Sequence, residues 1–170
     1  MSNEAPQTRH IWVIRHGKST ATQSGRRDHE RVLNKRGERD GQAMRTWFAA
    51  QANPAQWVWS SSAVRAKLTA SYVTAGFGAT FVEDASLYLA SAETAMATLK
   101  ATPSDVGSVA LVAHNPGLTY LVNMLSTEPI TDNLVTFGTT LFKFNGEWSD
   151  LAARTAEFIS LTTPKNVGSE

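Results

Sequence analysis

Two histidines and two arginines lie next to expected strand or helix boundaries, where side chains can reach a ligand. The tripeptide Arg15-His16-Gly17 follows one apolar run, and His114 follows another. Arg65 lies near the start of an expected helix, whose free N–H groups and positive dipole favour an anion. An arginine fork suits phosphate or carboxylate, and a histidine can be a nucleophile, a general base, a metal ligand or ordinary polar packing.

Each of these residues, taken singly, has an ordinary structural alternative. His16 could pack, Arg65 could be a solvated residue at a helix start, and His114 could be held by its neighbours. The other two histidines, His10 and His29, show no spacing typical of metal ligands, and we expect them to be structural or surface residues.

The elements that must position these residues alternate along the chain. Apolar runs predict strands at 10–14, 57–59, 80–82, 109–113, 141–144 and 158–161, with a hairpin turn at Asn145-Gly146. Helices are predicted over 34–52, 63–75, 91–101 and 116–126, with caps from Asn34, one of the serines 60–62, Ser91 and Asn115. This order predicts an α/β fold, a three-layer α/β/α sandwich whose central sheet is mostly parallel with an antiparallel C-terminal end.

Ligands of such sheets bind outside the carboxyl ends of the strands. The Arg-His-Gly tripeptide follows the first strand, Arg65 lies one turn into the helix after the second, and His114 follows the central strand. This coincidence indicates a site more strongly than any one of the residues does.

The composition excludes several kinds of protein. The 170 residues contain no cysteine, which excludes disulfides, thiolate metal sites and cysteine nucleophiles. No apolar run approaches the roughly 18 residues of a membrane span, and residues 1–9 lack the apolar region of a signal peptide. We expect a cytoplasmic protein with one domain over 1–170, of which 1–9 are flexible.

The charge is distributed unevenly although its net value is only +1. Residues 1–70 carry twelve Lys or Arg and five Asp or Glu, whereas residues 71–170 carry four and ten. The asymmetry predicts a basic surface or pocket built mainly by the first half, or else a solvated basic helix face. It does not favour nucleic acid, because the net charge is near zero and no basic run exceeds two residues.

Three segments together resemble the histidine phosphatase superfamily, which includes cofactor-dependent phosphoglycerate mutases and acid phosphatases. Ile14-Arg-His-Gly-Lys-Ser19 is similar to its signature, Ser61-Ser-Ala-Val-Arg65 to its second-strand motif, and Val112-Ala-His-Asn-Pro-Gly117 to its late histidine motif. The segment 29–40 and His114-Asn-Pro-Gly-Leu118 resemble the short phosphohistidine phosphatase type. The resemblance covers about residues 10–164.

The resemblance implies roles for individual residues. His16 would be the nucleophile that is transiently phosphorylated, with Arg15, Arg65 and a protonated His114 around the phosphoryl group. It also implies contacts of Gly17, Ser19, Thr22 and Asn115 with the phosphate or the substrate. Two arginines and a charged histidine neutralise a phosphoryl group without a metal, so we expect no metal site and no cofactor.

The sequence departs from the family pattern in two places. Thr22 stands where many members have a phosphate-binding asparagine. Larger members have an acidic proton donor after the third strand, for which only Glu83, Asp84 and Glu93 are candidates, and Glu93 is equally well explained as a first-turn helix carboxylate.

A missing acid favours a reactive phosphoryl donor, because imidazole, a weak base with a pKa of about 6.5, leaves from a P–N bond far more readily than an alcohol leaves from an ester. The leading hypothesis is a metal-independent phosphatase that forms a phosphohistidine on His16 and dephosphorylates phosphohistidine in proteins. The alternatives are a small-molecule phosphomonoesterase and a non-catalytic phosphate-binding module. The expected partner is a phosphorylated substrate, with neither nucleic acid nor a membrane, and no feature predicts an oligomeric state.

Overall fold

A computed structural model describes residues 7–22 and 27–168 of the chain. Its strands are β1 (Thr8–Arg15), β2 (Trp57–Ser60), β3 (Thr80–Glu83), β4 (Ser108–Ala113), β5 (Thr139–Asn145) and β6 (Glu157–Thr162). Its α-helices are α1 (Lys35–Ala49), α2 (Val64–Phe77), α3 (Ala92–Lys100) and α4 (Gly117–Leu125). Short 3-10 turns are η1 (Asp28–Glu30), η2 (Ala85–Leu87), η3 (Trp148–Asp150) and η4 (Pro164–Val167).

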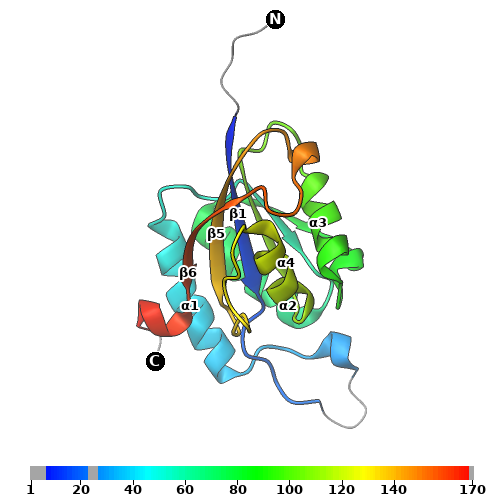
Figure 1. Cartoon of the computed structure of the whole chain (residues 1–170). Helices are drawn as coiled ribbons and strands as arrows, with labels where there is room; N and C mark the ends of the chain where they lie inside the picture. Colours follow the sequence, from blue (N-terminus) through cyan, green and yellow to red (C-terminus); the bar gives the residue numbers. More distant parts are fainter. Residues whose placement is uncertain (1–6, 23–26, 169–170) are drawn as a thin grey trace, which may run out of the picture.

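All six strands form one sheet in the order β3-β2-β4-β1-β5-β6 (Figure 1). The four strands from β3 to β1 are parallel to their neighbours, whereas β5 pairs antiparallel with β1 and β6 antiparallel with β5. The predicted mostly parallel sheet with an antiparallel C-terminal end is therefore confirmed. It brings the ends of β1, β2 and β4 to one edge.

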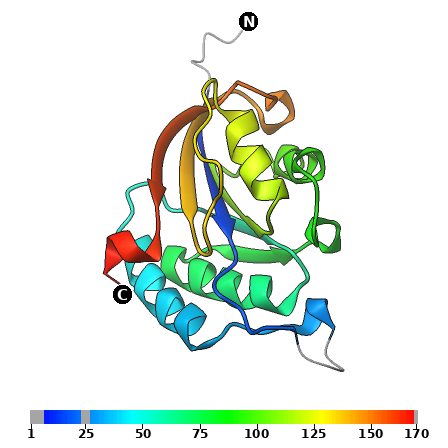
Figure 2. The ribbon, with the colours of Figure 1, turned by 60° about the horizontal axis from the view of Figure 1, so that its bottom comes forward.

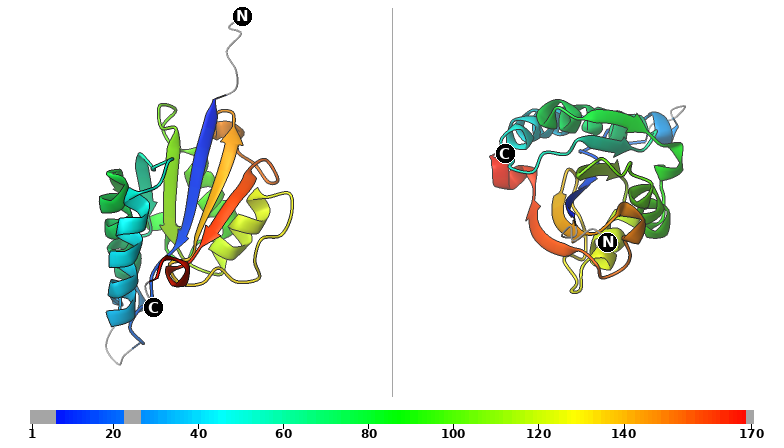
Figure 3. Two further views of the ribbon diagram at one scale, coloured as in Figure 1. Left: turned by 90° about the vertical axis from the view of Figure 1, so that its left-hand side faces the viewer. Right: turned by 90° about the horizontal axis from the view of Figure 1, so that it is seen from above.

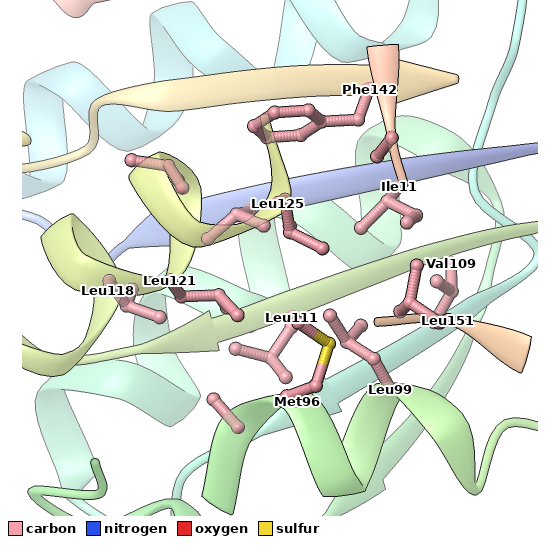
Figure 4. Close-up of a cluster of buried hydrophobic side chains, with 14 of the residues drawn as sticks. Ile11, Met96, Leu99, Val109, Leu111, Leu118, Leu121, Leu125, Phe142 and Leu151 are labelled. Carbon is pink, nitrogen blue, oxygen red and sulfur yellow. The ribbon is translucent and has the colours of Figure 1, made fainter. Parts of the chain in front are cut away.

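Side chains alternate between the two faces of this sheet, and each face has its own apolar core. Ile11 and Val13 of β1 pack with α3 and α4, whereas Trp12 and Ile14 pack with α1 and α2. Figure 3 shows α1 and α4 on opposite sides of the strands, and Figure 2 shows the same arrangement from another direction. Figure 4 shows side chains of α3 and α4 meeting those of the strands. The chain is thus a three-layer α/β/α sandwich.

The caps of the helices agree with the prediction at two places and differ at two others. Asn34 accepts a hydrogen bond from the backbone of Gly37 and begins α1, and Ser91 caps α3 through Thr94. The N-cap of α2 is Ala63, which makes no side-chain cap. The N-cap of α4 is Pro116, so this proline precedes the helix rather than opening it.

The predicted hairpin turn at Asn145-Gly146 is wrong. The backbone N–H of Gly146 donates to Gln7 beside β1, and the chain continues through η3 before β6 begins at Glu157. Trp148 of η3 is only 2% exposed and belongs to the apolar core. Its burial favours a longer connection between β5 and β6 over a tight turn.

The first strand is longer than predicted. It begins at Thr8 and includes Arg9, which is buried. Residues 1–6 lie outside the described residues, and the flexibility expected of residues 1–9 stays a prediction. Among the helices of the described residues, none has the length and hydropathy needed to cross a membrane.

Candidate active site

The register of the parallel strands sets the two histidines side by side. Arg15, the last residue of β1, pairs with Ala113, the last residue of β4. The next residues are His16 and His114, and their ring centroids lie 5.2 Å apart. The two apolar runs that predict the strands therefore also determine the distance between the histidines.

A pocket of about 690 Å³ opens at this edge of the sheet. Its walls come from the segment after β1, from η1, from the start of α2 and from the segments after η2, β4 and α4. Among residues 7–22 and 27–168, four cations line it, namely Arg15, Lys18, Arg31 and Arg65, against one carboxylate, that of Asp28. All four cations belong to the first 70 residues, so the basic pocket predicted for that half is present.

His16 is held as a neutral imidazole with one nitrogen available. Its Nδ1 lies 2.8 Å from the carbonyl oxygen of Gly17, which can only accept, so Nδ1 carries the proton and donates. The lone pair of Nε2 then faces Arg65, whose Nε lies 3.4 Å away. Burial, followed by the charges of Arg65 and Arg15, lowers the pKa of His16 to about 4. A neutral imidazole with an oriented tautomer is the form that can act as a nucleophile.

His114 is anchored from the second strand. The backbone N–H of Ser61 donates to Val112 of β4, which holds the Ser61 hydroxyl 2.7 Å from Nε2 of His114. Burial, followed by the neighbouring His16 and Arg65, lowers the pKa of His114 to about 3. His114 is therefore neutral at neutral pH in the pocket without a ligand, and its protonation around a phosphoryl group stays a prediction. A bound phosphoryl dianion would favour the protonated form.

Arg65 lies between both histidines and Asp28. Its side chain is buried, and its NH2 group lies 3.5 Å from Nδ1 of His114. NH1 donates to the backbone oxygen of Asp28 at 2.7 Å, and NH2 donates to Oδ2 of the same residue at 3.0 Å. The guanidinium is thereby fixed by one residue while its Nε edge faces His16.

Asp28 joins three side chains at the wall of the pocket. Its Oδ1 forms an ion pair with Arg31 at 3.2 Å, and its Oδ2 accepts from the hydroxyl of Tyr88 in addition to Arg65. The hydrogen bond from Tyr88, followed by Arg65, lowers the pKa of the Asp28 carboxyl below its usual value. Asp28 is therefore ionised at neutral pH and is not a proton donor.

Arg15 and Asn115 share a backbone acceptor. NH1 of Arg15 and the amide of Asn115 both donate to the carbonyl oxygen of Leu134, at 3.1 and 2.8 Å. The Asn115 carbonyl accepts from both the N–H and the hydroxyl of Thr119, which ties this side chain to α4. Its polar atoms are thus engaged within the protein, although the residue lines the pocket.

Three buried polar atoms on pocket residues have no hydrogen-bond partner among the described residues, namely Nε of Arg15, Nε of Arg31 and the hydroxyl oxygen of Thr20. Nε of Arg31 forms an ion pair with Asp28, which leaves the atoms of Arg15 and Thr20 without any partner of this kind. Buried polar groups are nearly always paired, and an orphan pair beside a cationic pocket fits an anion that would accept from them.

The other expected phosphate contacts divide into two groups. Ser19 lines the pocket, as Asn115 does. Gly17 is buried, and its N–H donates to the hydroxyl of Thr69 at 2.8 Å. This N–H is therefore engaged within the protein and is not available to a phosphate. Thr22 is exposed and lies outside the pocket lining, where Thr20 and Ala21 stand instead.

None of the three candidate proton donors lines the pocket. Glu83 forms a surface ion pair with Lys67 at 3.3 Å. Asp84 caps η2 through the backbone of Ser86. Glu93 is exposed in the first turn of α3 and lines a separate hollow.

The sequence reasoning missed Asp28 and Tyr88. Asp28 lies in a polar loop segment without periodicity, and Tyr88 is sixty positions away in the segment after η2. No local spacing links them, so only the fold reveals the pair. His29, expected to be structural, fits that expectation: its Nε2 lies 2.9 Å from the Ser62 hydroxyl, and its ring lies edge-on to Tyr88.

The pocket offers no evident metal cage. Within residues 7–22 and 27–168, no group of three or more His, Asp or Glu side chains is placed to hold a metal ion. Metal independence stays a prediction, supported by the four cations that a divalent ion would meet in this pocket.

A protein family whose sequence pattern matches this chain includes the segment that contains two of the pocket residues. The model of the histidine phosphatase superfamily (branch 1) matches residues 11–88, the part that contains His16 and Arg65. This part of the chain is therefore similar to the histidine phosphatase superfamily. The late histidine of the pocket, His114, lies beyond the matched residues.

Several relatives and solved structures are similar to the chain over most of its length. An uncharacterized protein of Mycobacterium tuberculosis, Rv1276c, is 26% identical over 161 residues, which is 89% of this chain and 100% of that protein. A structure of the protein histidine phosphatase SixA complexed with tungstate has a TM-score of 0.77 at 22% identity and covers 93% of this chain and 99% of its own. A protein of Nakamurella multipartitia proposed to be the phosphohistidine phosphatase SixA reaches a TM-score of 0.84 at 22% identity, covering 95% and 99%. The chain thus has the fold of these solved structures.

Proposed function

We propose that the chain is a metal-independent phosphatase that removes phosphoryl groups from phosphohistidine in proteins, through a phosphohistidine formed on His16. The observation that carries the proposal is the state of His16: a neutral, buried imidazole whose Nδ1 donates its proton to Gly17 and whose Nε2 accepts a long hydrogen bond from Nε of Arg65. This arrangement prepares a nitrogen nucleophile within a cationic pocket.

The reaction would proceed in two displacements. Nε2 of His16 forms a bond to phosphorus while the bond from phosphorus to the leaving nitrogen breaks, and that nitrogen takes a proton from solvent. In the second displacement, an oxygen of water forms a bond to phosphorus while the bond from phosphorus to Nε2 of His16 breaks. The water loses a proton to solvent, and the products are inorganic phosphate and neutral His16. The Gly17 carbonyl supports the charge that the imidazole gains in the first step, because it accepts from Nδ1 throughout.

The residues around His16 would neutralise the negative charge of the phosphoryl group. Arg15, Arg65 and a His114 that becomes protonated on binding would donate to the equatorial oxygens, which is most of what phosphoryl transfer requires. The unpartnered Nε of Arg15 supports this role.

The choice of a P–N substrate is supported by the absence of an acid among the described residues that line the pocket. The single carboxylate there, Asp28, is held ionised by Tyr88 and Arg65. An alcohol leaving group needs a proton donor, and imidazole needs one far less. The names of the solved relatives, which include protein histidine phosphatase SixA, favour the same class of substrate.

The deciding experiment measures kcat/KM for phosphohistidine, an aryl phosphate, phosphoserine and a sugar phosphate. We expect a steep fall as the leaving group becomes more basic. Equal or better turnover of the sugar phosphate would instead indicate a small-molecule phosphomonoesterase. No turnover of any donor would indicate a phosphate-binding module.

A further inference from the structure

A second hollow of about 390 Å³ adjoins the catalytic pocket. The two share Leu89, which lines both, so the hollow begins where the pocket ends. Its walls are the segment after η2, the first turn of α3 and the start of α4, including Leu89, Glu93, Pro116 and Tyr120. We call it the Leu89–Tyr120 hollow.

The floor of this hollow is fixed by a close backbone contact. A Cβ on Gly117 would lie 2.0 Å from the carbonyl oxygen of Ala90, so only glycine at the start of α4 lets the segment after η2 approach this closely. The contact ties the Leu89 segment to the residues that follow His114. Leu89 itself has φ of +50°, a left-handed conformation that is uncommon outside glycine and clusters at ligand sites.

Two of the side chains that line the hollow are large, mainly apolar and highly exposed. Leu89 is 57% exposed and Tyr120 64% exposed. A hollow of this volume is at the lower end of the roughly 300–1,000 Å³ of ligand pockets, so it suits one or two side chains rather than a large surface.

The charges that line the hollow make it unsuitable for a phosphoryl group. The described residues that line it include the carboxylate of Glu93 and no Lys, Arg or His. A phosphoryl dianion is therefore directed into the catalytic pocket, with its four cations, and the hollow is left for an uncharged part of the same substrate.

We propose that the Leu89–Tyr120 hollow binds an apolar side chain that lies close to the phosphorylated histidine on a protein substrate. The inference rests on the proposed function. It adds that the enzyme selects its protein substrate by an apolar residue close to the phosphohistidine. Because the hollow and the pocket share Leu89, the same substrate molecule spans both.

Synthetic peptides with one phosphohistidine test the proposal. In each, leucine replaces serine at one of the three positions on either side of that residue. For the wild type we expect leucine at one or two positions to raise kcat/KM fivefold or more over the all-serine peptide, mainly through KM. Tyr120→Ser should remove this preference and leave kcat/KM for free phosphohistidine within twofold, since Tyr120 does not line the catalytic pocket.

Ile159→Ser is the matched control, because it removes an apolar side chain of β6 that is 45% exposed and lines neither cavity. It should retain the full leucine preference. Equal turnover of all peptides by the wild type, or an unchanged preference in Tyr120→Ser, would overturn the inference while free phosphohistidine is still hydrolysed. Failure to hydrolyse free phosphohistidine as well would count against the proposed function, and the inference would fall with it.

Discussion

The Asp28 carboxylate bonds to the same guanidinium that faces the nucleophile. Asp28 accepts from Arg65 through both its backbone oxygen and Oδ2, while Nε of Arg65 lies 3.4 Å from Nε2 of His16. The negative charge of Asp28 in this cationic pocket has two opposing effects. It orients Arg65, and it weakens the positive potential that attracts the phosphoryl group.

Asp28→Asn should separate these two effects. We expect kcat to fall about tenfold because Arg65 loses a charged acceptor, while inorganic phosphate inhibits at a several-fold lower concentration because the pocket loses a negative charge. Glu83→Gln, which alters a surface ion pair outside the pocket, should change neither quantity. An unchanged kcat in Asp28→Asn would show that the carboxylate does not position Arg65.

His16→Ala should abolish turnover and leave the fold intact. Wild-type protein quenched during turnover should carry an acid-labile, base-stable phosphate on His16, detectable by mass spectrometry of the intact chain. His10→Ala, on the same strand but at its far end, serves as the control and should stay active. Near-normal activity of His16→Ala would exclude the covalent mechanism.

The two buried histidines should make stability depend on pH below about 6.5. Their pKa values are about 4 and about 3 in the folded protein, whereas an unfolded histidine titrates near 6.5, so the unfolded chain binds more protons between these values. The free energy of unfolding should therefore fall as the pH is lowered from about 6.5 towards 4. Urea unfolding at a series of pH values should show a shallower fall for His114→Gln, and an identical slope would contradict these pKa values.

Chelation should leave the rate unchanged, and vanadate should inhibit competitively. The reason is the set of four cations that line the pocket, which would repel a divalent ion. Activity is measured after exhaustive dialysis against chelator and again after adding single metals. A large loss that one specific metal restores would overturn this expectation.

The carboxylates of Glu83, Asp84 and Glu93 should contribute little to the chemistry. Glu83→Gln, Asp84→Asn and Glu93→Gln should each lower kcat/KM for an aryl phosphate by less than roughly tenfold, against the 10²–10⁴-fold typical of a lost general acid or base. The structure supports this expectation because none of them lines the pocket. A dependence on leaving-group pKa that becomes steep in one variant only would identify that carboxylate as the acid.

The sequence predicts the fold well where burial is uniform along an element. Every residue of β4 is buried, so its apolar run identifies a central strand, and the parallel register then follows for His16 and His114. Asn34 and Ser91 are correctly predicted caps because capping is local.

Prediction fails where distant parts of the chain determine the structure. Asn145-Gly146 favours a turn locally, but the burial of Trp148 outweighs that preference. Asp28 meets Tyr88 and Arg65 only in the folded chain, and the lowered pKa of His114 depends on the burial and on neighbours from other elements.

The register of β1 with β4 has a consequence for how such an enzyme can diversify. The spacing of the two histidines is set by backbone pairing between Arg15 and Ala113, and not by the length of chain between them. Insertions after η2 or after α4 could lengthen the walls of the site while the reacting pair keeps its geometry. New substrates would then be accessible to natural selection or to protein engineering by exchanging loops alone.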